Sequence, residues 1–145
     1  MASLSEVLAD PAKRKRVVDD GVAMIEAEVA DKSGLSGIAI KTAFKMVQSV
    51  KPGFVGGTLN HLLDDFAKKV DPFWTAAVAE GGDASKNFQR KGPQVAEALL
   101  TITDARARSA SGPVRATYDK LRPEASKHVL VAMPRVAGLL KKYAT

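Results

Sequence analysis

Helix start and stop signals recur at short intervals along this chain, and they constrain its fold more than any other feature. Asp-Pro, an N-cap followed by a proline suited to the first helical position, occurs at residues 10–11 and 71–72. Ser3 and Glu6 form a capping box. Neither sustained period-2 alternation nor an Asn-Gly or Asp-Gly turn between β-branched runs suggests a strand. The sequence therefore predicts an all-α fold with no sheet.

Apolar residues spaced three and four apart fill the segments between these signals, as they do in amphipathic helices. Gly21 lies inside the first long stripe, where a close helix crossing would account for a residue that disfavours helices. Pro123 is expected to kink its helix or begin the next, and Pro134 predicts a kink or break near residues 130–133. After the capping box, the expected helices cover residues 11–32, 36–50 with Ser36 as N-cap, 58–70, a short helix from 71, a short turn after Asp83, 92–109, 113 onward, and a last stripe over 129–143.

The chain has 145 residues, the usual size of one domain, and can bury about 70% of the surface that it exposes when unfolded. We expect residues 1–145 to form a single compact bundle of about six to eight unequal helices. The first long helix and the last apolar helix are expected in its core. Phe54, Phe73 and Trp74 lie beside turns and are expected to fill the ends of the bundle, with anchoring of a partner as the alternative.

Several kinds of site are disfavoured by the residues present. The chain has no cysteine, and His61 and His128 each lack a second ligand at metal spacing. The hydrolase motif G-x-S-x-G and the metal-binding helix motif H-E-x-x-H do not occur. We therefore expect no metal, no cofactor and no catalytic residue, and an enzyme ranks third among the classes of function.

The location of the protein is predicted from its apolar segments. The N-terminal residues lack the apolar region of a secretory signal. The longest stretch without Asp, Glu, Lys or Arg is Pro52 to Leu63, well short of the roughly 20 residues that a membrane span needs. We therefore expect the protein to be cytoplasmic and to have no membrane span.

Residues 31–45, DKSGLSGIAIKTAFK, place glycines before a lysine, as phosphate-binding loops do. A P-loop requires G-x-x-x-x-G-K-[ST] after a strand, but Lys41 follows Gly37 by four positions and a helix precedes the glycines. A turn between two helices is therefore the preferred interpretation. The alternative is a small anion at the N-terminus of the helix that Ser36 begins, with Lys41 and Lys45 on one helical face.

Asp104 is the second candidate for polar chemistry, because it follows an apolar run. It fits an i, i+4 ion pair with Arg108, and a partly buried pair with Arg106 or Lys41 is the alternative. A ligand between the helices would therefore lie near the start of the second long helix and residues 103–106. The candidate ligand-binding residues are Ser36, Lys41, Lys45, Asp104 and Arg106.

Positive charge is concentrated in the second half of the chain. Residues 1–72 hold 10 Lys or Arg and 10 Asp or Glu, whereas residues 73–145 hold 12 and 6. Such asymmetry fits an acidic partner, protein or nucleic acid, although a small domain also gains solubility from a net charge of this size. The candidate partner-binding residues lie in the basic run near the N-terminus and around a later turn: Arg14, Lys15, Arg16, Arg108 and Arg115.

Three long blocks carry a resemblance to a known family: VVDDGVAMIEAEVADKSGLSGIAIKTAFKMVQSVKPGFV, VAEALLTITDARA and TYDKLRPEASKHV. They resemble a family of small uncharacterised bacterial proteins, a domain of unknown function that spans nearly this whole chain. The resemblance implies no activity, cofactor or functional residue.

Two functions stay open on the sequence. The first is a non-enzymatic interaction protein that binds an acidic protein or nucleic acid through a basic surface. The second is a helical bundle with a pocket for a small anionic ligand. A homodimer is open in either case. An enclosed pocket with convergent polar groups would favour the second function, and a flat basic face would favour the first.

Overall fold

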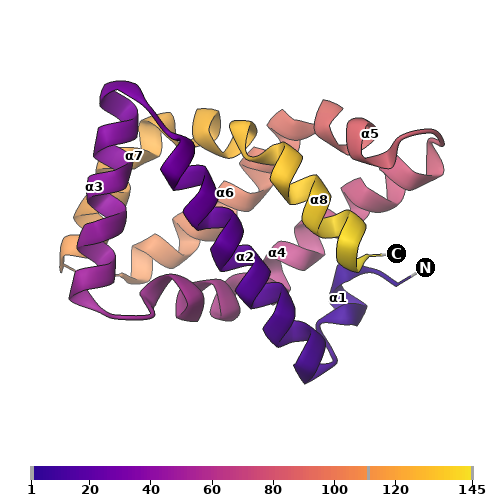
Figure 1. Cartoon of the computed structure of the whole chain (residues 1–145), viewed down its shortest axis with the longest axis horizontal. Coiled ribbons are helices and arrows are strands. Elements are labelled where there is room, and N and C mark those ends of the chain that lie inside the picture. Colours follow the sequence, from indigo (N-terminus) through magenta and orange to yellow (C-terminus); the bar gives the residue numbers. More distant parts are fainter. Residues whose placement is uncertain (1, 111, 145) are drawn as a thin grey trace.

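The structure is a computed structural model that describes residues 2–110 and 112–144, and this part of the chain folds into helices without a strand. α2 crosses the front of the molecule, α3 closes one side, and the two termini lie close together at the opposite end (Figure 1). The elements are α1 (Leu4–Val7), α2 (Pro11–Asp31), α3 (Gly34–Val50), α4 (Phe54–Ala79), α5 (Ala84–Arg90), α6 (Gly92–Ser109), α7 (Gly112–Val131) and α8 (Met133–Tyr143).

Most of the expected helix boundaries are confirmed. The Ser3 hydroxyl accepts a hydrogen bond from the Glu6 amide at 3.1 Å, which completes one half of the capping box. The Asp10 carboxylate accepts from the Ala12 amide at 2.9 Å and so caps α2. The helical run is interrupted at Ala132, between α7 and α8, as the proline at 134 predicts.

The prediction of a short helix beginning at Asp71-Pro72 is wrong, because α4 continues through Pro72. Val70 and Trp74 are buried on either side of the proline, so packing holds the helix across the missing hydrogen bond. The Asp71 carboxylate caps a different helix: it accepts from the Leu4 amide at 2.8 Å and the Ser5 amide at 3.0 Å. The Asp-Pro pair therefore joins α4 to α1 instead of dividing α4.

Three further expectations at helix starts differ from the structure. α4 begins at Phe54, four residues before the expected start at 58. α3 begins at Gly34, which has a φ of 71°, and its N-cap is Ser33 instead of Ser36. Ser36 lies in the first turn, and its hydroxyl is used in a tertiary hydrogen bond described below. α7 continues through Pro123, so this proline neither ends the helix nor begins another. The serine at 111, expected in the turn before α7, lies outside the described residues.

α8 lies in the core as expected, with Met133 and Leu140 buried, whereas Val17 is the one apolar side chain that α2 fully buries, and α4 supplies more of the core. Trp74 of α4 packs edge-on against Phe88 of α5, with ring centroids 5.8 Å apart, and its indole N–H donates to the Ala144 carbonyl at 3.0 Å. Trp74 therefore lies in the core and ties α4 to the C-terminal segment. The larger buried side chains around this pair come from four other helices: Leu4, Val7, Val17, Val95, Met133 and Leu140.

Gly21 marks the close crossing of α2 and α4 that its position predicts. The residue is buried, and a Cβ at this position would lie 2.6 Å from the Leu59 Cδ2 atom of α4. Because a side chain here would push Leu59 away, glycine lets the two helices approach each other. This crossing forms one wall of an apolar cavity.

Candidate functional site

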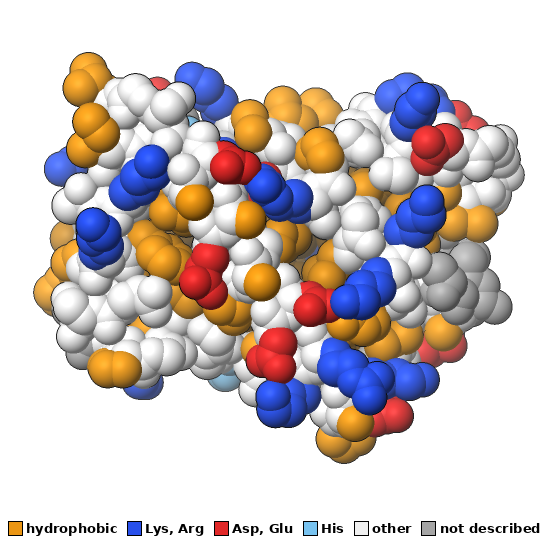
Figure 2. Space-filling view, in the orientation of Figure 1, with side chains coloured by type: hydrophobic (Ala, Val, Ile, Leu, Met, Phe, Trp, Pro, Cys, Tyr) orange, Lys and Arg blue, Asp and Glu red, His pale blue; other side chains and the backbone are white. Residues whose placement is uncertain are grey.

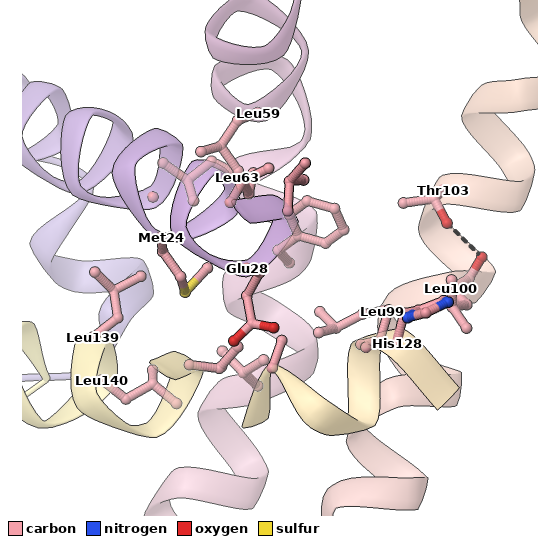
Figure 3. Close-up of a pocket in the computed structure, with 18 of the residues that line it drawn as sticks. Met24, Glu28, Leu59, Leu63, Leu99, Leu100, Thr103, His128, Leu139 and Leu140 are labelled. Carbon is pink, nitrogen blue, oxygen red and sulfur yellow. Dashed lines mark hydrogen bonds between the residues drawn. The ribbon is translucent and has the colours of Figure 1, made fainter. Parts of the chain in front are cut away.

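A cavity of about 340 Å³ lies between the long helices. Figure 3 shows leucines from α4, α6 and α8 directed into it, and Figure 2 shows hydrophobic side chains deep between α2 and α3. Nearly all of the atoms that face the space are apolar. The lining residues with hydrocarbon side chains include Val17, Ile25, Val29, Ile40, Leu59, Leu63, Phe66, Val70, Leu99, Leu100, Val129, Val136, Leu139 and Leu140.

Polar side chains reach the cavity at the end of α2. Glu28 and Lys32 both line it, and their side chains are only 12% and 10% exposed. Figure 3 shows Glu28 extending from α2 into the space between the leucines. Its carboxylate accepts from Lys32 Nζ at 3.2 Å and from Arg135 of α8 at 2.6 Å, while Arg135 also pairs with Asp31 at 2.7 Å. Burial in this setting requires such pairing, because an unpaired charge would be strongly destabilising.

His128 and Thr103 are the other polar lining residues. His128 Nε2 lies 2.7 Å from the Ser36 hydroxyl, which joins the end of α7 to the start of α3. Burial lowers the pKa of the His128 imidazole, and the nearby cations Lys32 and Lys127 lower it further, against an opposing effect of Glu124. The Thr103 hydroxyl donates to the Leu100 carbonyl at 3.1 Å (Figure 3), and it also lies 2.8 Å from the Tyr118 hydroxyl of α7, so it already has partners.

The lowered pKa of His128 gives a pH dependence of stability that can be measured. Below the ordinary histidine pKa of about 6.5, the unfolded chain binds the proton more readily than the folded chain. The free energy of unfolding should therefore fall as the pH decreases from about 6.5 through the folded pKa of His128. Urea unfolding at a series of pH values checks this. His128→Gln should flatten the slope in that window, and an unchanged slope would contradict the assignment.

The side chains at the cavity pair with one another, and none of them forms a nucleophile–base–orienter set. Across residues 2–110 and 112–144 no group of three or more His, Cys, Asp or Glu residues could hold a metal ion. An apolar space with a few polar groups at one end is the usual form of a small-molecule site.

A second, smaller groove lies between α6 and α7 and has a volume of about 290 Å³. Arg108, Arg115 and Arg122 all line it. Asp104 receives hydrogen bonds from Arg122 Nε at 2.8 Å and Nη2 at 3.2 Å, and also from the Tyr118 hydroxyl. The Arg122 bonds, followed by the Tyr118 bond, hold the pKa of Asp104 below its usual value.

The predicted ion-pair partners of Asp104 are wrong. Asp104 pairs with Arg122 of the next helix instead of Arg106, Arg108 or Lys41. The fork of a guanidinium matches a carboxylate in two parallel bonds, which a neighbour on the same helix does not achieve here. Arg106 is exposed on α6.

The five candidate ligand-binding residues do not converge on one point. Ser36, Lys41, Lys45, Asp104 and Arg106 are all absent from the cavity lining. Their neighbours Ile40 and Thr103 do line it, so the start of α3 and the 103–106 region lie around the same space.

The candidate partner-binding residues divide into two groups. Arg14 is held on α4 by the Asn60 side chain at 2.9 Å and by Asp64 at 2.8 Å, and Lys15 pairs with Asp19 at 2.9 Å. Arg16 is exposed. Arg108 and Arg115, by contrast, meet in the α6–α7 groove described above.

Sequence reasoning missed Glu28, Lys32 and His128 as cavity residues. The signal for Glu28 was present, because it follows Val17, Gly21 and Met24 at the spacing of one helical face. A charged residue in register with apolar positions is buried and paired or faces a cavity. No comparable signal existed for Lys32, which lies past the last turn of α2.

Comparison with known proteins gives one result. The model of a family described as "Family of unknown function (DUF6918)" matches residues 4–144. No curated protein and no solved structure is significantly similar to the chain. In the described residues, every helix is too short or too polar to cross a membrane.

Proposed function

Since the chain belongs to this family of unknown function, which brings no activity with it, we propose from the geometry that the protein binds a small amphipathic molecule without catalysis. The apolar part of the ligand occupies the cavity between α2, α4, α6 and α8. Its polar group, an acceptor such as a carboxylate, lies at the end where Lys32 and His128 reach the lining.

The single observation that carries this proposal is the size and character of the cavity. Its volume of about 340 Å³ falls within the range of about 300–1,000 Å³ typical of ligand pockets. An engineered apolar cavity of about 150 Å³ already binds benzene, so an apolar space of this size is large enough for a longer hydrocarbon.

The hydrogen bonds of Lys32 favour a ligand whose polar group accepts hydrogen bonds. An ammonium group has three donors, and the two acceptors near Lys32 Nζ are Glu28 at 3.2 Å and the His128 carbonyl at 3.5 Å. Both distances lie at the long end of the range for such bonds. A ligand carboxylate therefore meets a cation that has room for another acceptor, while the apolar walls bind its chain.

Calorimetric titration with straight-chain carboxylates of increasing length tests the proposal. Affinity should rise by about fourfold for each added methylene, the equivalent of about 0.8 kcal/mol, until the cavity is full. Lys32→Met should weaken binding of a carboxylate by about tenfold and leave the matching alcohol unaffected, since a charge-assisted hydrogen bond contributes about 1.5–3 kcal/mol. Lys41→Met is the matched control, because Lys41 lies on α3 outside the lining.

Affinity that does not depend on chain length would contradict the apolar site. Equal losses in the Lys32 and Lys41 variants would contradict the placement of the polar group. Native mass spectrometry of protein purified gently at about 0.1 M salt gives an independent readout, since a bound small molecule adds its mass to the chain.

We also propose a second function, binding of an acidic partner in the α6–α7 groove, because three arginines (Arg108, Arg115 and Arg122) line it against two carboxylates (Asp104 and Asp119). Guanidinium groups suit planar anions, and Asp104 already fixes the orientation of Arg122. On immobilised heparin, a polyanion, the Arg108→Ala/Arg115→Ala double variant should elute at clearly lower salt than wild type. Arg106→Ala removes an arginine outside the groove lining and should have a smaller effect. If each removed arginine lowered the eluting salt concentration by the same amount in the groove variant and in Arg106→Ala, a defined binding site in the groove would be contradicted.

A further inference from the structure

α3 presents large apolar side chains to solvent. Leu35 is 88% exposed and Ile38 is 62% exposed, and a spacing of three places them on one face of the helix. Most surfaces tolerate single exposed apolar residues, but neighbouring ones of this size mark a contact surface. Gly34 has a φ of 71°, so α3 starts directly at a turn.

The end of α7 also presents an exposed apolar side chain. Val131 is 59% exposed and lines a shallow groove together with Lys32. The bond between Ser36 and His128 holds the start of α3 beside this end of α7. Figure 2 shows hydrophobic side chains at the corner where α3 begins, with basic side chains next to them.

The charge of α3 is of one sign. The helix contains Lys41 and Lys45 and no acidic residue, and Lys45 is exposed. At the neighbouring end of α2, Asp31 is paired with Arg135. Exposed Leu and Ile side chains beside lysines that pair with no acidic residue in the described part of the chain are complementary to an anionic bilayer. There, apolar groups enter the interface and lysines face the lipid phosphates.

A second copy of the chain fits this surface less well. A symmetric dimer would place the same patch of both copies face to face, which brings Lys41 and Lys45 towards their own counterparts. A stable dimer also buries about 800 Å² on each copy, more than two exposed side chains on one helical turn provide.

We propose that the exposed face of α3, with Leu35 and Ile38 inserted and Lys45 facing the headgroups, docks the protein on an anionic lipid surface. Docking of this kind is peripheral and reversible, because two side chains enter the interface and the helix does not span it. It does not require an occupied cavity, so it stands apart from the proposed ligand binding.

Vesicle flotation tests this with two lipid compositions, phosphatidylcholine alone and phosphatidylcholine mixed with phosphatidylglycerol. The wild-type chain should partition at least about tenfold more strongly to the anionic vesicles. Leu35→Ser/Ile38→Ser should reduce that partition by about tenfold or more, and Lys45→Gln by about fivefold. Lys69→Gln, an exposed lysine of α4, is the control for charge and should change it little.

Several results would overturn the proposal. Equal partition to neutral and anionic vesicles would exclude the electrostatic part, and equal losses for Lys45→Gln and Lys69→Gln would exclude α3 as the contact. Absence of vesicle binding, together with a dimer in sedimentation that Leu35→Ser/Ile38→Ser dissociates, would assign the surface to a second copy. Circular dichroism checks that the variants remain folded, and carboxylate titration without vesicles tests the cavity separately.

Discussion

Replacement of Trp74 by alanine is expected to lower the free energy of unfolding by about 3–5 kcal/mol, the largest effect of any single substitution described here. The side chain is buried between α4 and α5, and its removal leaves a cavity beside Phe88. It also removes the donor that bonds the Ala144 carbonyl at 3.0 Å, so that a buried acceptor loses its partner. Urea unfolding followed by circular dichroism measures the change, because Trp74 is the chain's one tryptophan and fluorescence would lose its reporter.

Two matched variants separate these contributions. Trp74→Phe keeps most of the apolar packing and loses the N–H donor, so it should cost about 1–3 kcal/mol. Leu35→Ala removes an apolar side chain of similar chemistry from a position that is 88% exposed, and it should change stability by less than about 0.5 kcal/mol. A loss for Trp74→Ala as small as that for Leu35→Ala would contradict the central position of the indole.

Filling the cavity should abolish most ligand binding. Val29 of α2 lines the cavity, so Val29→Phe places a phenyl ring into that space. If the ring excludes about three methylenes of the ligand at about 0.8 kcal/mol each, affinity for a long carboxylate falls by roughly fiftyfold. Stability should change little, because the ring occupies existing space instead of displacing packed atoms. Calorimetric titration and urea unfolding give the two readouts.

Val131→Phe is the control for this substitution. It makes the same chemical change at a position that is exposed and absent from the cavity lining. The control should bind the carboxylate as the wild type does. Undiminished binding by Val29→Phe would place the ligand elsewhere, and equal loss in both variants would point to a general effect of added apolar surface.

The α4 helix shows where local signals are insufficient. Asp71-Pro72 has the same sequence as Asp10-Pro11, but only Asp10-Pro11 begins a helix. Local chemistry permits both outcomes, because proline is tolerated inside a helix when tertiary packing replaces the missing bond. The burial of Val70 and Trp74 decides the matter at residue 72, and that burial depends on helices distant in sequence.

The candidate site shows the same division. Ser36 and Asp104 were selected for their chemistry along the chain, and the structure pairs each of these two with a partner from another helix. Asp104 meets Arg122, 18 positions later, and Ser36 meets His128, 92 positions later. Spacing within one helix predicts contacts at three and four residues only, so pairs of this kind lie beyond its reach.

The sequence by itself determined that the chain is all-helical and where most of its helices begin and end, since caps, prolines, glycines and apolar spacing act over a few residues. It also determined the uneven distribution of positive charge. The tertiary structure alone decided that α2, α4, α6 and α8 leave an apolar space between them and that Glu28 and Lys32 reach it. The physical reason is that a cavity results from how helix surfaces fail to interlock, which depends on crossing angles and on close contacts such as that of Gly21 with Leu59.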